Sequence, residues 1–174
     1  MTHWRLSHRA DPAGRRIYSR HYSCPDPEAT TRQFVKPGSC LVLKTDTALW
    51  VTAAPIGAYV KHFWAGAWEC AVFRNESDIC SSDLIREAVA LTLGHYGEPP
   101  ELGMVTFVDP RRVSGFYVRT RAGTELRWGY SFWRAGFKFC GWTKGGLYAL
   151  QLLPGEMPEP LTLPKAQQSL FEAA

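Results

Sequence analysis

The densest group of chemically versatile side chains in the sequence is the run Arg20-His21-Tyr22-Ser23. A histidine with a pKa near neutrality moves protons or binds a metal through a ring nitrogen. A tyrosine beside it can stack on a nucleobase or hydrogen-bond to the edge of one. We therefore predict that His21, Tyr22 and Ser23 are catalytic. A surface loop that tucks in one aromatic ring is the structural alternative.

A second group of candidates follows two apolar segments, 68–74 and 104–108, which we predict to be strands. Arg74 and Glu76 end the first segment, and Asp109 ends the second. Open α/β sheets bind ligands at the carboxyl ends of their strands, so we expect these three side chains to lie together in a catalytic pocket. Arg74 suits a phosphate or carboxylate, while Glu76 and Asp109 can accept a proton. The alternatives are an Arg74–Glu76 ion pair and a turn capped by Asp109.

The plausible metal ligands of the sequence are His21, His62, Glu76 and Asp109. Two histidines and one carboxylate would suit Fe(II), although no local His-x-Asp spacing supports such a set. We take His21, Glu76 and Asp109 as the candidate ligands. The five cysteines are scattered and include no Cys-x-x-Cys pair, so they indicate neither a disulfide framework nor a zinc site.

Positive charge is concentrated in two segments, 2–32 and 111–134, of a chain whose net charge is +4. Arginine outnumbers lysine there, and planar guanidinium groups bind phosphates and base edges well. Ordinary solvated surface is the alternative. Aromatic residues interleave with the second segment, and of these we expect Tyr130 and Trp133 to pack on a helix face. The candidate DNA-binding side chains are Arg20, Arg32, Gln33, Arg111, Arg112, Arg119 and Arg121.

Regular elements have to position these side chains, and hydrophobic patterns predict them in an alternating order. A helix begins at Ser81, with the Ser81-Ser82 pair as its N-cap and Gly94 or Gly97 as its end. A second helix is predicted over 126–135. Residues 1–38 are expected to be loops with one short helix. The predicted strands cover 39–45, 49–53, 68–74, 104–108, 137–142 and 147–152.

This order of strands and helices indicates an α/β fold. The 174 residues, of which 45% are hydrophobic, suit one domain with its own core. We place this domain at 1–154 and a Pro-rich linker with a flexible tail at 155–174. No apolar run approaches the roughly 18 residues of a membrane span, and the N-terminus lacks the apolar core of a signal peptide. We therefore expect a cytoplasmic protein without membrane contact.

The segment Tyr130-x-x-x-x-Ala135-Gly136-Phe137 is similar to the C-terminal half of GNAT N-acyltransferases. The resemblance covers roughly 39–152 and implies a mixed central sheet flanked by helices, with a strand that splays open over an acyl donor. The family's glycine-rich pyrophosphate loop is replaced here by 74–82, which contains two carboxylates and no glycine. Only Arg74, Ser81 and Ser82 remain as candidate cofactor-binding residues, which speaks against ordinary acetyl-CoA use.

A narrower resemblance, over 15–150, is to the Mom family of GNAT-like phage DNA-modification proteins. It implies conversion of adenine in duplex DNA to N6-carbamoylmethyladenine, protection of phage DNA from restriction, iron as an associated metal, and an active site that includes the His-Tyr loop. The cellular setting would be the cytoplasm of a bacterial host, and the donor of the transferred group stays open. The motifs that carry the resemblance are 20–23, 32–38, 73–76, 81–82 and 107–110.

The C-terminal run Gln167-Gln168-Ser169-Leu170-Phe171 resembles the pentapeptide that binds the bacterial sliding clamp. Such a motif works from a mobile terminus, where Gln167, Leu170 and Phe171 would dock into a clamp pocket. A chance match of five residues is the alternative.

The preferred hypothesis is a transferase that modifies adenine in DNA after flipping the base out of the duplex. An acetyl-CoA-dependent N-acetyltransferase of a small amine is the second hypothesis, and the missing glycine loop speaks against it. A non-catalytic module associated with DNA or with the clamp is the third, and it leaves the polar loop ends unexplained.

Overall fold

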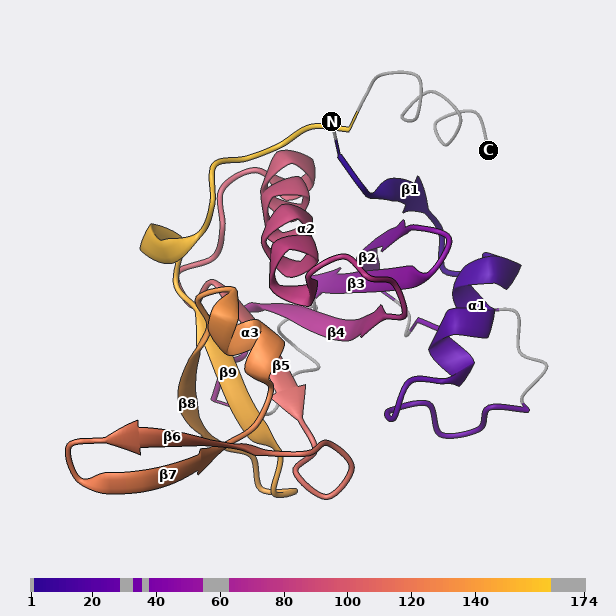
Figure 1. The fold of residues 1–174 in the computed structure, drawn as a ribbon. Helices are drawn as coiled ribbons and strands as arrows, with labels where there is room; N and C mark the ends of the chain where they lie inside the picture. Colours follow the sequence, from indigo (N-terminus) through magenta and orange to yellow (C-terminus); the bar gives the residue numbers. More distant parts are fainter. Residues whose placement is uncertain (1, 29–32, 36–37, 55–62, 164–174) are drawn as a thin grey trace.

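The structure is a computed structural model that describes residues 2–28, 33–35, 38–54 and 63–163 (Figure 1). Its centre is a seven-stranded sheet in the order β1-β2-β3-β4-β5-β9-β8. Neighbouring strands are antiparallel except for β4 and β5, which are parallel. The strands are β1 (Arg5–Ser7), β2 (Ser39–Lys44), β3 (Ala48–Ala54), β4 (Trp68–Asn75), β5 (Met104–Val108), β8 (Lys138–Trp142) and β9 (Tyr148–Leu152). The mixed sheet and its helices confirm the predicted α/β class.

Three α-helices accompany this sheet: α1 (Pro12–Ser19), α2 (Ser81–Tyr96) and α3 (Tyr130–Arg134). The long helix α2 lies across the sheet, and its apolar face forms the main core with strand residues such as Trp50 and Leu150. The short helix α1 packs on the side of β3 and β4 (Figure 1). Within the described part of the chain, none of the helices is long and apolar enough to cross a membrane.

The start of α2 differs from the predicted serine cap. Cys80 occupies the N-cap position and its side chain makes no capping bond, while Ser81 is the first helical residue. The Ser81 hydroxyl instead accepts a hydrogen bond from Asn75 Nδ2 at 3.0 Å, so it is not available to cap the helix. The end of α2 is the predicted one, because Gly97 adopts φ +81 there, which favours glycine.

The helix predicted over 126–135 is wrong in its first half. Leu126 lies in a strand. Helix α3 begins only after Gly129, whose φ of +76 is left-handed and so cannot belong to a right-handed helix. The strand belongs to a two-stranded hairpin, β6 (Phe116–Thr120) and β7 (Gly123–Arg127), that forms a separate small sheet. The hairpin was not predicted because residues 116–127 lack the strict apolar-polar alternation of a half-buried strand.

The chain stays in contact with the domain beyond residue 155, where the linker was predicted to begin. A 3-10 turn spans Pro154–Glu156, and the following chain runs along α2, where the Leu161 amide donates to the Ala90 carbonyl at 2.9 Å. A Cβ added at Gly94 would lie 1.8 Å from the Leu161 carbonyl oxygen, so the helix needs glycine at this crossing. The clamp-motif residues Gln167, Leu170 and Phe171 lie outside the described residues.

The parallel strands β4 and β5 pair only at their beginnings, where Trp68 faces Met104 and Glu69 faces Val105. Beyond this point β4 continues beside β3, and β5 continues beside β9. The Thr106 hydroxyl still bridges the strands by donating to the Cys70 carbonyl at 3.1 Å. The two strands therefore part in the middle of the sheet, and this parting positions the candidate site.

Candidate functional site

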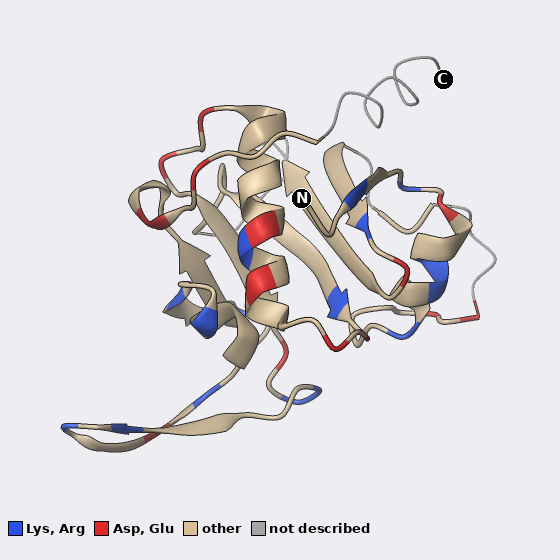
Figure 2. Cartoon of the chain, turned by 45° about the horizontal axis from the view of Figure 1, so that its top comes forward, with Lys and Arg blue, Asp and Glu red and all other residues tan. Residues whose placement is uncertain are grey.

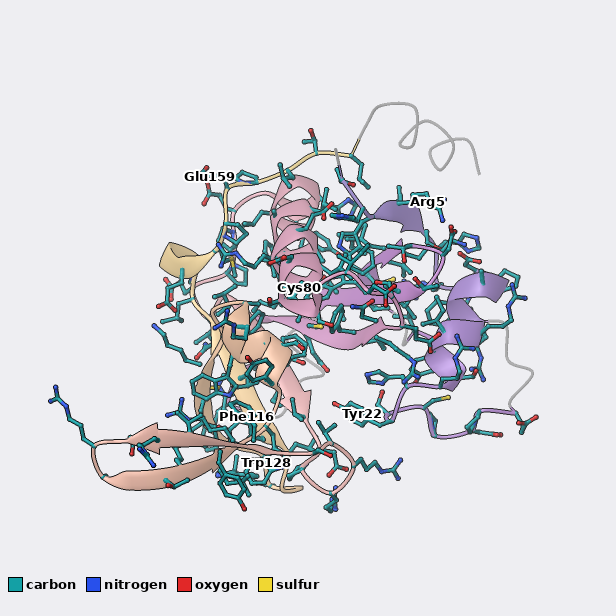
Figure 3. The ribbon with its side chains drawn as sticks, in the orientation of Figure 1. Arg5, Tyr22, Cys80, Phe116, Trp128 and Glu159 are labelled. Atoms are coloured by element: carbon teal, nitrogen blue, oxygen red, sulfur yellow. The ribbon has the colours of Figure 1, made fainter. Side chains whose placement is uncertain are left out.

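A cavity of about 270 Å³ lies where β4 and β5 part. Its walls come from both strands, from the loop after α1, from the loop after β5 and from the start of α3. Figure 3 shows Tyr22, on the loop after α1, near the end of β5. The described lining residues are His21, Tyr22, Cys70, Ala71, Phe73, Thr106, Phe107, Val108, Val113, Ser114, Gly129, Tyr130, Ser131 and Phe132.

The cavity is uncharged at neutral pH. Its described lining includes no aspartate, glutamate, lysine or arginine. Burial, with a contribution from the nearby Arg74 charge, lowers the pKa of His21 to about 4. Burial raises the pKa of Tyr22 to about 12 and raises the pKa of the Cys70 thiol well above its ordinary value. These three groups are therefore neutral at pH 7.

His21 is held in a turn that directly follows α1. Asp11 caps the start of this helix, because its carboxylate accepts a hydrogen bond from the Ala13 amide at 2.8 Å. After the helix, the His21 amide donates to the Tyr18 carbonyl and closes the turn. The His21 ring is 8% exposed, and its Nδ1 lies 2.7 Å from the Ser23 hydroxyl. Ser23 is exposed and lies outside the cavity lining, so its observed contact is with the imidazole.

Tyr22 ties this turn to the far strand of the cavity. Its hydroxyl donates to the Phe107 carbonyl at 3.1 Å, and its ring centroid lies 4.4 Å from that of His21. Its own carbonyl accepts from Arg112 at 2.9 Å. His21 and Tyr22, both predicted as catalytic, thus stand together in the cavity wall.

Asp109 lies beside this contact. Its carboxylate accepts two hydrogen bonds from the Arg111 guanidinium, at 2.8 and 3.0 Å, and lies 3.9 Å from Arg112. The Arg111 guanidinium holds the pKa of Asp109 below its ordinary value. Arg111 and Arg112, both predicted to bind DNA, therefore have structural partners at the cavity rim.

Glu76 directly follows β4 and contacts Arg20, which ends α1. It accepts from Arg20 at 2.7 Å through both oxygens and from Arg74 at 2.5 Å. These hydrogen bonds from Arg20 and Arg74 lower the pKa of Glu76 to about 2. Among the described residues Glu76 and Asp109 thus pair with different arginines, rather than forming the one carboxylate cluster that the sequence suggested.

The loop between β4 and α2, residues 76–80, is filled by its own hydrogen bonds. Asn75 Oδ1 accepts from the Ser77 amide at 2.9 Å, and the Ser77 hydroxyl accepts from the Ile79 amide at 3.2 Å. The predicted cofactor-binding hydroxyls are also engaged, Ser81 with Asn75 and Ser82 with the Cys80 sulfur at 3.2 Å. With these amides used and Glu76 beside them, the loop does not fit a pyrophosphate.

The candidate metal ligands do not come together as a set. Among the described residues, no group of three or more His, Cys, Asp and Glu side chains is placed to hold a metal ion. His21 Nδ1 faces Ser23, and the two carboxylates face guanidinium groups. His62 lies outside the described residues. The described residues do not fit the iron that the family resemblance implies.

The other candidate DNA-binding residues differ in their surroundings. Gln33 is exposed, and Arg32 lies outside the described residues. Arg119 and Arg121 are exposed on the β6–β7 hairpin, and neither pairs with an acidic side chain within the described ranges. These two side chains are the ones whose guanidinium groups remain available to a ligand.

Sequence reasoning missed the aromatic wall of the cavity. Tyr130, expected in the core, is 59% exposed and lines the cavity, with the Phe116 ring 5.1 Å away. Phe73, Phe107 and Phe132 complete this wall. One sequence signal could have identified Tyr130 as a cavity residue. It is the first residue of the GNAT-like segment, which follows the two parting strands in the chain.

Comparisons with known proteins assign no family to this geometry. A scan against protein-family models and searches of curated proteins and of solved structures each found no match. The function has to be inferred from the side chains that form the site.

Proposed function

We propose that this chain is a GNAT-like transferase that modifies the exocyclic amine of adenine in DNA. The observation that carries the proposal is the cavity between β4 and β5, which is small, aromatic and uncharged. The product would be an N6-substituted adenine of the carbamoylmethyl type, which would shield phage DNA from restriction. The donor of the transferred group is not assigned.

The strand arrangement supports the GNAT-like part of this proposal. The resemblance implies a mixed sheet with a strand pair that opens over the acyl donor. Here the one parallel pair opens after Glu69 and Val105, and the GNAT-like segment from Tyr130 follows on the side of the opening. This arrangement supports a GNAT-like reaction in which the donor and the accepting base would meet at the opening.

The neutrality of the cavity favours a nucleobase over a small alkylamine. An alkylamine with a pKa near that of lysine, about 10.4, is a cation at pH 7 and would need a carboxylate partner. The described lining supplies none. Adenine is uncharged, and stacking of a base on aromatic rings contributes about 1–3 kcal/mol.

The size of the cavity points in the same direction. Sites for drug-sized ligands usually span about 300–1,000 Å³, and the present volume of about 270 Å³ lies just below that range. This suits a single planar ring system rather than a larger substrate. A base in duplex DNA would reach it only after rotating out of the helix stack.

Tyr22 is the side chain best placed to orient the amine. Its hydroxyl donates to the Phe107 carbonyl and its oxygen is also hydrogen-bonded to the Asp109 backbone, so one lone pair is left to accept from an adenine N6–H group. His21 contacts Ser23 and, through a hydrogen bond, the backbone of Phe73, so we assign it to holding the Tyr22 ring. In the transfer itself, N6 forms a bond to the transferred carbon as the bond from that carbon to the leaving group breaks, and the leaving group departs with its electron pair and takes up the N6 proton.

The decisive experiment is mass spectrometry of nucleosides from DNA of cells that express the protein. The wild-type protein should give a deoxyadenosine of increased mass. Ser114→Trp, which places an indole in the cavity from an exposed loop position, should abolish this product, while the matched Ser114→Ala protein should retain it. Tyr22→Phe should reduce it about tenfold or more by removing one acceptor. Unmodified deoxyadenosine with the wild-type protein would contradict the proposal.

A further inference from the structure

The β6–β7 hairpin, residues 116–127, projects from the body of the protein as an arm (Figures 1 and 2). It pairs with no strand of the seven-stranded sheet among the described residues. An isolated two-stranded hairpin is marginally stable in water, so its length is not explained by the stability of the domain. Figure 2 shows Lys and Arg positions along the arm and at its tip.

The base of the arm is fixed to the cavity. The Phe116 ring meets the cavity residue Tyr130, and the Arg127 guanidinium lies 4.2 Å from the centroid of the Trp133 ring in α3. A Cβ added at Gly115 would lie 2.7 Å from a Leu126 methyl group and 3.0 Å from the Arg127 carbonyl oxygen, so the chains are in close contact there. The arm therefore has a defined direction relative to the cavity.

The outer part of the arm presents side chains that the protein itself does not use. In a hairpin, alternate residues and their cross-strand partners share one face, so Tyr117 and Arg119 lie on the face opposite Phe116. Tyr117 is 76% exposed beside its partner Leu126, which is 39% exposed. Arg119 and the turn residue Arg121 have no acidic partner among the described residues.

We propose that this arm enters the major groove of duplex DNA beside the base that is held in the cavity, an inference that rests on the proposed function. The major groove is about 12 Å wide and 8.5 Å deep and admits a two-stranded β-ribbon, whereas the minor groove is only about 6 Å wide and takes one only when the duplex is deformed. Strands of five residues extend about 17 Å at roughly 3.4 Å per residue, which is long enough to reach the groove floor.

The chemistry of the exposed face suits this groove. Arginine binds the O6 and N7 atoms of guanine through two hydrogen bonds, and apolar side chains contact the thymine methyl group. Arg119 and Leu126 supply these two kinds of contact, and Arg121 at the turn suits a phosphate. A polyanion is the partner that complements arginines without internal carboxylate partners.

The first test measures how DNA binding depends on salt, by fluorescence anisotropy with a 20-base-pair duplex. The doubly substituted Arg119→Ala, Arg121→Ala protein should bind more weakly and show a salt slope lower by about one, since Arg121 is assigned to a phosphate and each phosphate contact contributes about 0.9. The control protein carries Arg5→Ala and Arg16→Ala, which remove equal charge from β1 and α1, and it should keep the wild-type slope. An arm variant with the wild-type slope and affinity would overturn the proposal.

The second test identifies the groove by methylation interference. Methylation of guanine N7 blocks the major groove, and methylation of adenine N3 blocks the minor groove. Interference at guanine N7 that disappears in the arm variant supports the proposal; interference at adenine N3 alone would overturn it.

The same samples separate this proposal from the proposed function. If wild-type protein modifies deoxyadenosine but the arm variant binds DNA like wild type, the arm proposal fails alone. If the arm variant shows the reduced salt dependence of DNA binding but the wild-type protein leaves every nucleoside unmodified, the proposed function fails. The arm then remains a DNA-binding element.

Discussion

Two arginine-bearing regions lie next to the cavity and use their arginines differently: the β6–β7 arm, and a loop region made of Glu76 with Arg20 at the end of α1 and Arg74 at the end of β4. In the loop region, Arg20 and Arg74 both bind Glu76. At the tip of the arm, Arg119 and Arg121 find no carboxylate within the described residues. The comparison teaches that an arginine becomes a candidate for a ligand only when the fold leaves its guanidinium without an internal partner.

The arm itself repeats this contrast over a short distance. Its base is packed, because Phe116 meets Tyr130 and Arg127 meets Trp133. Its tip is open, and a Cβ added at Gly123 would meet nothing within 4 Å. Substitutions at the base should therefore change the stability of the protein, whereas substitutions at the tip should change what it binds.

The largest effect on stability is expected at Gly129, which joins the arm to α3. Its φ of +76 disfavours any side chain, and an added Cβ would also lie 2.8 Å from a Leu150 methyl group. Gly129→Ala should lower the free energy of unfolding by about 2–3 kcal/mol in urea titrations. The control Gly146→Ala has a similar φ of +77 with nothing within 4 Å, and it should cost only about 1 kcal/mol. Equal losses would show that the arm base is not tightly packed.

A smaller effect is expected for Glu76→Gln in the loop region. The substitution leaves Arg20 and Arg74 without their shared carboxylate, and the free energy of unfolding at pH 7 should fall by about 1 kcal/mol. Glu125→Gln on the arm removes a carboxylate that is 47% exposed and binds a single arginine, Arg127. It should lower the free energy of unfolding by less than about 0.5 kcal/mol. A greater loss for Glu125→Gln would reverse the proposed contrast.

The Glu76 effect should also depend on pH. The pKa of Glu76 is lowered from its ordinary value of 4.5 to about 2, so its contribution is present above 4.5 and lost as the pH falls toward 2. The difference in melting temperature between wild type and Glu76→Gln should therefore be largest near neutrality and disappear at about pH 2. A constant difference across this range would mean that shape, not charge, causes the loss.

Much of the fold was predictable because its elements carry local patterns. Helix α2 and six strands of the central sheet, all but β1, have continuous or periodic apolar residues, and the structure contains them close to the predicted bounds. Strand β1 (Arg5–Ser7) lies in a segment that was predicted to form loops with one short helix. The arm was missed because β7 is exposed on both faces apart from Arg127 and β6 is only partly buried on one face, so the sequence shows no strict apolar-polar alternation there. The parting of β4 and β5 is a tertiary feature, since each strand simply follows a different neighbour.

The candidate site was predictable in part for the same reason. The density of polar groups in the run from Arg20 to Ser23 pointed to His21 and Tyr22, and both line the cavity. The Arg74–Glu76 ion pair and the turn capped by Asp109, both given as alternatives, are present. Arg20 and Arg112 were not predictable as partners, because they reach these two carboxylates from a distant part of the chain or across a turn. Nor does any local pattern show that Tyr130 faces a cavity rather than the core.

The smallest effect on stability, and the sharpest test of the comparison, is expected for the Arg119→Ala, Arg121→Ala protein. Exposed side chains without internal partners contribute little to folding, so its free energy of unfolding should stay within about 0.5 kcal/mol of wild type. Its melting curve serves as the measurement, taken in the buffer of the DNA-binding assay. A protein that loses DNA affinity while keeping this stability has lost a contact to the ligand. If stability fell together with affinity, the two arginines would belong to the fold, and the arm would resemble the loop region in its use of charge.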